Sequence, residues 1–178
     1  MDITSPIWQA MVLAYVDDAA SKGFDGVMLD AIDSPLYWAE KNAPKKLDLM
    51  QAHAATLIHA IHKAHPSMKI MLNRGFSLLP LVAYEIDYVL AESIMINTDL
   101  STRQFTPFSP NTYNEAVAQL QHAVALAPHL RVFTLDYWNQ DDGKGLEHIY
   151  TTQRAQGFTP YVTTPDLRRF TPNRRRFW

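Results

Sequence analysis

The chain has 178 residues, of which 47% are hydrophobic and 19% charged, and its formal net charge at pH 7 is −2. This composition predicts an ordinary globular domain rather than a disordered tail, a collagen-like repeat or a membrane protein, since no apolar run approaches the roughly 20 residues of a spanning helix. The absence of cysteine excludes disulfide frameworks, thiolate metal sites and a cysteine nucleophile. We expect one domain over residues 1–178, long enough to bury a hydrophobic core.

The two ends of the chain differ in charge. Residues 166–178 form a basic tail with five arginines and one acid, Asp166, so this segment carries +4 and, taken from −2, leaves −6 for residues 1–165. Such a tail can contact phosphate or an acidic partner, although a solvated terminus is the simpler interpretation. The start, MDITSPIW, has no basic segment followed by an apolar stretch, so no signal peptide is expected in it.

The chain is predicted to alternate helices with short apolar strands. A first helix is expected to begin at Ser5-Pro6, an N-cap followed by proline, and to end at Gly23. Five continuously apolar runs, typical of strands covered on both faces, follow in order: Gly26–Asp30, Lys69–Asn73, Tyr88–Glu92, Arg131–Asp136 and Thr159–Thr163. Residues with helical periodicity are expected to fill the gaps as helices over 47–65, 77–85, 111–127 and 143–157.

This alternation predicts an α/β fold with a parallel sheet. The longest irregular segment is expected over Ser93–Pro110, which contains two prolines and follows a strand. In a parallel sheet this position lies at the edge where active-site loops are found.

Four of the five predicted strands end in a polar side chain: Asp30, Asn73, Glu92 and Asp136. The carboxyl ends of parallel strands share one edge, where ligands bind in open α/β sheets and in barrels alike. We therefore expect these residues to converge on one site. The alternative is that they cap the helices that follow or pair with Arg74.

A glycosidase needs at least two carboxylates that face each other, and Asp30 and Glu92 are the best-placed pair. Asp33 follows Asp30 closely enough to influence it. Tyr137 and Trp138 come directly after Asp136, and an acid beside aromatic rings is typical of sugar recognition. Four further aromatic residues can add to this surface or pack in the core: Tyr37, Trp38, Phe76 and Tyr161.

Other chemistries have less support in the sequence. His59, His62 and His65 are three residues apart on one predicted helix, but no HExxH motif is present. Neither of the glycine-rich nucleotide motifs GxGxxG and GxxxxGK[ST] occurs, and the GxSxG elbow is also absent. We therefore expect no metal and no organic cofactor.

The motifs at the strand ends resemble those of glycoside hydrolase family 114, the endo-α-1,4-polygalactosaminidase group, and of the related Pel polysaccharide hydrolase domain of family 166. The resemblance covers residues 1–170 in colinear order. It rests on GFDGVMLDAID (23–33), LNRGF (72–76), VLAES (89–93), TLDYW (134–138) and GFTPYVTTPDL (157–167).

The resemblance implies a (β/α)8 barrel that hydrolyses α-1,4 bonds between galactosamine or N-acetylgalactosamine units with retention. It implies that Asp30 is the nucleophile and Glu92 the general acid/base, with their carboxyl groups about 5–5.5 Å apart. The sugar subsites would be lined by Asp33, Asn73, Asp136, Tyr137 and Tyr161, and the aromatic argument adds Trp138.

A complete barrel takes about 250 residues, so the resemblance implies a partial TIM barrel of about five βα units without the family's first three strands. The chain would then be a fragment, or its start would be misassigned, or it would assemble with the N-terminal part of the barrel or with another chain. A non-catalytic polysaccharide-binding or scaffold fragment is thus an alternative to the enzyme, as is a sugar-active enzyme of another linkage specificity. The partner expected is a galactosamine-containing polysaccharide, with no nucleic acid and no membrane insertion. A secreted or periplasmic location is implied by the family alone.

Overall fold

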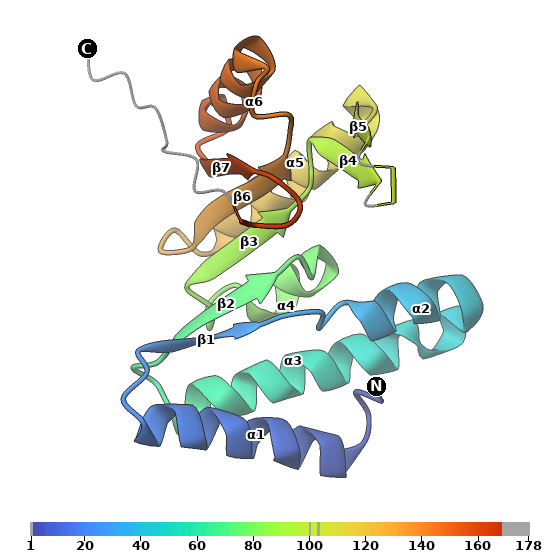
Figure 1. Ribbon diagram of the computed structural model, residues 1–178. Helices are drawn as coiled ribbons and strands as arrows, with labels where there is room; N and C mark the ends of the chain where they lie inside the picture. The colour runs from blue at the N-terminus through green and yellow to red at the C-terminus, as the bar shows by residue number, and fades with distance from the viewer. Residues whose placement is uncertain (1, 100, 103, 169–178) are drawn as a thin grey trace. The chain divides into compact units, whose positions relative to one another are not determined.

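The computed structural model describes residues 2–99, 101–102 and 104–168 (Figure 1). Its helices are α1 (Pro6–Ser21), α2 (Ser34–Asn42), α3 (Leu47–Ala64), α4 (Leu79–Val82), α5 (Pro110–Leu126) and α6 (Gly143–Ala155), with 3₁₀ turns η1 (Pro44–Lys46) and η2 (Phe76–Leu78). The main sheet has the order β1 (Gly26–Leu29), β2 (Lys69–Asn73), β3 (Tyr88–Glu92), β6 (Arg131–Tyr137), β7 (Thr159–Thr163). The strands β4 (Ile96–Asp99) and β5 (Gln104–Pro107) form a second sheet. The predicted α/β class is confirmed.

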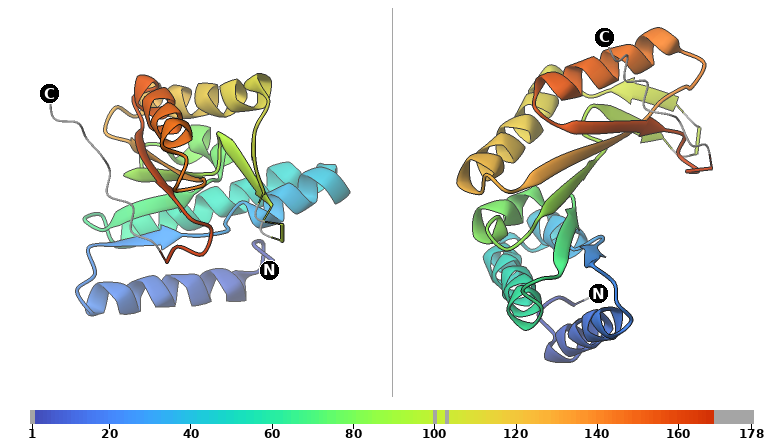
Figure 2. Two further views of the ribbon diagram at one scale, coloured as in Figure 1. Left: turned by 45° about the horizontal axis from the view of Figure 1, so that its top comes forward. Right: turned by 90° about the vertical axis from the view of Figure 1, so that its left-hand side faces the viewer.

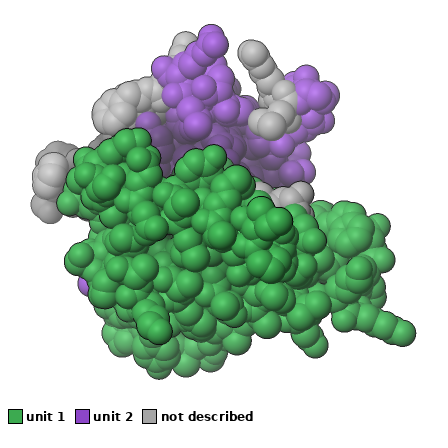
Figure 3. Space-filling model, turned by 90° about the horizontal axis from the view of Figure 1, so that it is seen from below, with its two compact units in different colours: residues 1–89, 122–130 green, residues 90–121, 131–178 purple. Residues whose placement is uncertain are grey.

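The chain divides into two compact units (Figure 3). Unit 1 comprises residues 1–89 and 122–130, and unit 2 comprises residues 90–121 and 131–178, so the division falls within β3. The expectation of one domain over residues 1–178 stays a prediction. Of the predicted basic tail, residues 169–178 lie outside the described residues.

Unit 1 is built on the parallel pair β1–β2, whose register runs from Gly26 opposite Lys69 to Leu29 opposite Leu72. Three helices, α1, α2 and α4, pack against α3, and α1 and α3 lie side by side (Figures 1 and 2). Leu57, Ile58 and Ile61 recur at helical spacing and are fully buried. Burial of each such side chain contributes about 1.5–3 kcal/mol, so the apolar stripe of α3 contributes several kcal/mol to the stability of this unit.

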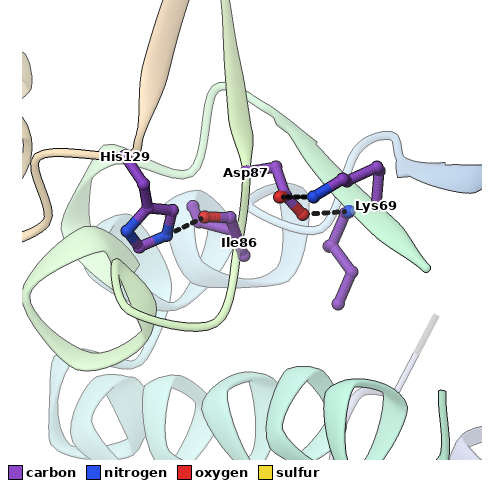
Figure 4. A network of polar contacts seen from close by, with 5 residues as sticks. Lys69, Ile86, Asp87 and His129 are labelled. Atoms are coloured by element: carbon purple, nitrogen blue, oxygen red, sulfur yellow. Dashed lines mark hydrogen bonds and ion pairs between the residues drawn. The ribbon is translucent and has the colours of Figure 1, made fainter. Parts of the chain in front are cut away.

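A polar network joins the amino ends of β2 and β3 in unit 1 (Figure 4). The Asp87 carboxylate accepts hydrogen bonds from Lys69 Nζ at 2.7 Å and from the Ile70 backbone N–H at 3.1 Å. His129 Nε2 donates to the Ile86 carbonyl oxygen at 3.1 Å. These contacts lie at the strand ends opposite to the predicted site, so they hold the strands in place rather than take part in chemistry.

Unit 2 is built on the parallel pair β6–β7, with Phe133 opposite Thr159 and Tyr137 opposite Thr163. Helix α6 packs against β7. The core of this unit is a cluster of buried Ile96, Ile149, Tyr150 and Val162, with Met95, Phe105, Trp138 and Leu146 packed against it.

Of the helices in the described ranges, none has both the length and the apolar character needed to cross a membrane.

The prediction of an irregular segment over Ser93–Pro110 is wrong. This segment contains the antiparallel hairpin β4–β5, in which Ile96 lies opposite Pro107 and Asp99 opposite Gln104. Ile96 and Phe105 are the apolar side chains that attach the hairpin to the cluster of unit 2. The remaining residues of the two strands are polar apart from Pro107, so no apolar run marked these strands in the sequence. Helix α2 was also not predicted, and the helix predicted over 77–85 is shorter, consisting of η2 and α4.

The predicted glycine ends of two helices are confirmed. Gly23 follows α1 with φ of +82°, and Gly157 follows α6 with φ of +83°. Their N–H groups donate to the carbonyls of Ala20 at 3.0 Å and Arg154 at 2.9 Å. Glycine adopts this left-handed conformation without steric cost, so the same device ends a helix before a strand in each unit.

Candidate active site

Three of the four predicted polar strand-end residues share an unusual backbone feature. Asp30 follows β1, Asn73 ends β2 and Glu92 ends β3, and in each case the next residue has a positive φ although it is not glycine. These residues are Ala31 at +56°, Arg74 at +59° and Ser93 at +41°. Such a conformation costs about 1–3 kcal/mol per residue and is found preferentially at functional sites. The chain thus turns sharply at three strand ends, directly after each candidate residue.

In unit 1, Asp30 is exposed and Asn73 is buried beside it. Asn73 Nδ2 donates a hydrogen bond to Asp30 Oδ1 at 2.9 Å. The expected convergence of these two strand ends is confirmed by this contact. A buried amide therefore orients a solvent-accessible carboxylate at this strand end.

Asp33 connects the turns that follow β1 and β2. Its Oδ2 accepts from the Gly75 N–H at 3.5 Å and lies 3.8 Å from Arg74 Nε. The Arg74 guanidinium also lies over the Phe76 ring, 5.5 Å from its centroid. Arg74 therefore forms an ion pair with Asp33, which was not one of the strand-end residues considered for this pairing. A direct contact of Asp33 with sugar stays a prediction.

In unit 2, Glu92 is half-buried and its Oε1 accepts a hydrogen bond from the Tyr137 hydroxyl. Tyr137 is buried at the carboxyl end of β6. Burial, reinforced by the Glu92 carboxylate, raises the pKa of Tyr137 well above its ordinary value. The phenol therefore remains a hydrogen-bond donor at neutral pH and holds the Glu92 carboxylate in one orientation.

Asp136 differs from the other strand-end acids because it is fully buried. Its Oδ1 accepts from the backbone N–H groups of Met95 at 3.1 Å and Ile96 at 3.0 Å. Its Oδ2 accepts from Gln153 Nε2 at 3.0 Å. Desolvation raises the pKa of Asp136, although these donors favour its charged form. These hydrogen bonds of the Asp136 carboxylate are all to other residues of the chain. Its expected contact with sugar stays a prediction.

Trp138 combines a core contact with a polar one. Its ring centroid lies 5.8 Å from that of Phe105, and its Nε1 donates to Asp142 Oδ2 at 3.1 Å. Asp142 is the N-cap of α6, where its Oδ1 accepts from the Gly145 N–H at 3.0 Å. Tyr161 is half-buried on β7. Stacking of sugar on Trp138 or Tyr161 stays a prediction.

Two of the other aromatic residues are well placed to meet a ligand. Tyr37 and Trp38 lie on α2, in the segment that follows Asp33, and are 58% and 53% exposed. Lys41 donates to the Tyr37 hydroxyl and its Nζ lies 4.1 Å from the ring centroid. Both side chains remain largely accessible to solvent, and exposed aromatic rings are typical of carbohydrate-binding surfaces.

The hairpin β4–β5 begins four residues after Glu92 and was missed from the sequence. Asp99 Oδ1 accepts from the Ser101 hydroxyl at 2.6 Å and from the backbone N–H groups of Ser101 and Thr102 at 2.8 and 3.2 Å. The hydrogen bonds from Ser101 and Thr102 lower the pKa of Asp99 to about 2. The signal available in the sequence was this Asp-x-Ser-Thr turn between two short polar runs, since such residues are typical of tight turns.

Two of the three histidines that the sequence placed on one helix contact acidic side chains. His59 Nδ1 contacts the Glu85 carboxylate, and His65 Nε2 lies 2.7 Å from Asp17 Oδ1. Over residues 2–99, 101–102 and 104–168, no group of three or more histidine, cysteine, aspartate or glutamate side chains is arranged to hold a metal ion.

A family model for glycoside-hydrolase family GH114 matches residues 1–176. This chain belongs to family GH114. The GH114 chain is 24% identical over 171 residues to an uncharacterized protein of Thermotoga maritima, covering 90% of this chain and 51% of that protein. The chain thus spans about half the length of this curated relative.

Solved structures share the fold of this GH114 chain. The glycoside hydrolase domain of PelA from Pseudomonas aeruginosa superposes with a TM-score of 0.78 at 24% sequence identity, and a single-substitution variant of that domain with 0.78 at 23%. Each match covers 93% of this chain and 63% of the solved chain. The predicted family resemblance and the partial-barrel fold class are therefore confirmed. Asp30 lies in unit 1 and Glu92 in unit 2, and their predicted separation of about 5–5.5 Å stays a prediction.

Proposed function

We propose that this GH114 chain carries the catalytic residues of a retaining endo-glycosidase that hydrolyses α-1,4 linkages in galactosamine or N-acetylgalactosamine polymers. The observation that carries the proposal is the family match over residues 1–176. The geometry supports it, because each proposed carboxylate follows or ends a strand and accepts a hydrogen bond from the end of another strand.

In the first half of the reaction, Asp30 acts as the nucleophile. An oxygen of its carboxylate bonds to the anomeric carbon while the bond from that carbon to the glycosidic oxygen breaks. Glu92 transfers its proton to the departing oxygen, which leaves as a hydroxyl of the shortened polymer. The Asn73 amide keeps the Asp30 carboxylate oriented throughout.

In the second half, water releases the sugar from Asp30. The Glu92 carboxylate takes one proton from water, whose oxygen bonds to the anomeric carbon as the ester bond to Asp30 breaks. Both residues return to their starting protonation states, so water is the single co-reactant. Two displacements at one carbon leave its configuration unchanged, which defines a retaining enzyme.

We place the sugar subsites around these carboxylates. Asn73 and Asp33 are the proposed polar contacts, and Tyr137, Trp138 and Tyr161 the proposed aromatic ones. Asp136 is fully buried and takes part through the residues that it holds. A polymer substrate implies action where exopolysaccharide is found, so we propose a secreted or periplasmic location.

The test compares Asp30→Asn and Glu92→Gln in the complete encoded protein, with partially deacetylated galactosaminogalactan as the substrate and released oligosaccharides measured by mass spectrometry. We expect losses of about 10²–10⁴-fold. Asp141→Asn is the matched control, because it removes one carboxylate from an exposed turn. Proton NMR of the first released sugars should show the α-anomer. Near-wild-type cleavage by both variants, or the opposite anomer, contradicts the proposal.

A second candidate is a binding module of the same fold that holds polysaccharide without cleaving it. The exposed pair Tyr37 and Trp38 favours it, since stacking on sugar needs no carboxylate. In that case Trp38→Ala abolishes retention of the protein on insoluble polymer and Asp30→Asn changes nothing. The enzyme is distinguished because Asp30→Asn then binds polymer but does not shorten it.

A further inference from the structure

The segment that follows Glu92 is attached to β6 by a buried carboxylate. We propose that Asp136 is a positioning residue for Glu92 and that Gln153 supports it in this role. This inference rests on the proposed acid/base function of Glu92.

Three hydrogen bonds hold the turn after Glu92 against β6. The Ser93 N–H donates to the Leu135 carbonyl at 3.0 Å. The N–H groups of Met95 and Ile96 both donate to Asp136 Oδ1. Ser93 has φ of +41°, and a strained residue persists when its surroundings over-determine it. The path of the chain after Glu92 is therefore restrained by Asp136 together with the Leu135 carbonyl.

The second carboxylate oxygen of Asp136 also accepts a hydrogen bond. Gln153 is fully buried on α6 and donates from Nε2 to Asp136 Oδ2 at 3.0 Å. Gln153 Oε1 accepts from the Tyr113 hydroxyl of α5 at 3.2 Å. Asp136 is thus surrounded by donors, which suits a carboxylate that only accepts. Burying such a group is costly, and an apolar residue of similar size would avoid that cost without holding the turn.

The neighbouring residue contacts Glu92 itself. Successive side chains of a strand point to opposite faces, so Asp136 faces Gln153 of α6 whereas Tyr137 faces the Glu92 carboxylate. Two adjacent residues of β6 therefore hold Glu92, one through its backbone turn and one through its side chain. A catalytic group must be held within about 0.5 Å of its productive position, and this double attachment provides that restraint.

The test uses the leaving-group dependence of kcat/KM. We would compare phenyl and 2,4-dinitrophenyl glycosides of an α-1,4-galactosamine oligomer in the complete encoded protein. The dinitrophenyl group departs without a proton, so loss of acid catalysis affects the phenyl substrate selectively. Asp136→Asn is expected to lower kcat/KM about 10–100-fold for phenyl, since a displacement near 1 Å costs about 10²-fold, and less than about threefold for dinitrophenyl. Amide hydrogen exchange at Met95 and Ile96 should become faster.

The control is Thr134→Val, two residues earlier on the same face of β6. Thr134 is buried, and its hydroxyl has no hydrogen-bond partner within the part of the chain that the structure describes. This variant disturbs the same strand without touching the network, so its ratio of phenyl to dinitrophenyl rates should equal that of wild type. Gln153→Leu removes one donor to Asp136 and should give a smaller defect of the same kind, which keeps the test available if Asp136→Asn does not fold.

The outcomes separate this inference from the proposed function. The positioning role is overturned if Asp136→Asn and Gln153→Leu slow both substrates equally, or slow neither, while Glu92→Gln still slows the phenyl substrate selectively. If Glu92→Gln itself slows both substrates equally or neither, the acid/base assignment fails, and the inference fails with it.

Discussion

At the scale of the residue, Ala31 is the simplest of the three left-handed positions because its side chain is a single methyl group. Alanine at a φ of +56° is strained by about 1–2 kcal/mol relative to its ordinary conformation, and glycine is not. We predict that Ala31→Gly raises the free energy of unfolding by about 1 kcal/mol. Because the freed backbone no longer fixes Asp30, kcat should fall several-fold. Denaturant titration and steady-state kinetics on one preparation measure both.

The control for this prediction is Ala43→Gly. Ala43 follows α2 with a negative φ of −150°, so it lacks the left-handed conformation of Ala31. The substitution should lower the free energy of unfolding by about 0.5–1 kcal/mol, because glycine gains more freedom in the unfolded chain. A change of the same sign in both variants would show that backbone strain at Ala31 is not the cause.

At the scale of the element, the start of α6 depends on one close contact. A Cβ atom at Gly145 would overlap the Trp138 indole nitrogen and the Asp142 carboxylate. We predict that Gly145→Ala displaces the indole and weakens the Asp142 cap, which costs about 1–2 kcal/mol. Denaturant titration gives the free energy of unfolding, and a shift of tryptophan emission reports the displaced ring.

Gly143→Ala is the matched control in the same helix. No atom lies within 4 Å of a Cβ built at Gly143, and alanine favours a helix more than glycine does. The free energy of unfolding should therefore stay constant or rise slightly. Equal destabilisation by both substitutions would attribute the effect to helix propensity and refute the contact.

The elements predicted best are those whose burial is continuous along the sequence. The five strands of the main sheet were located within one residue at each end, because runs such as KIMLN in β2 have an unbroken apolar centre, Ile70–Leu72. The hairpin β4–β5 could not be located in this way. Ile96 and Phe105 are stabilised by packing on Ile149 and Val162, more than 40 residues later in the sequence.

The burial of the predicted site residues could not be predicted from the sequence either. Glu92 and Asp136 have the same sequence pattern, an acid that closes an apolar run, yet one is half-buried and the other fully buried. The difference is one of face, because side chains alternate along a strand. Asp136 falls on the face of β6 that also buries Val132 and Thr134, whereas Glu92 falls on the less buried face of β3. An unbroken apolar run does not show which face its closing residue occupies.

At the scale of the whole molecule, the distribution of charge bears on the choice of polymer. Residues 1–165 carry −6 and the chain as a whole −2, whereas a deacetylated galactosamine polymer carries ammonium groups. Attraction between them should raise the association rate and be screened by salt, since the Debye length is about 10 Å at 0.1 M. We predict that kcat/KM for partially deacetylated polymer falls several-fold between about 0.05 and 0.5 M NaCl, over which screening strengthens. The fully N-acetylated polymer, being uncharged, is the control and should show almost no change. An equal response of both polymers would mean that the acidic surface does not select the substrate, and that recognition depends on hydrogen bonds and aromatic stacking at the strand ends.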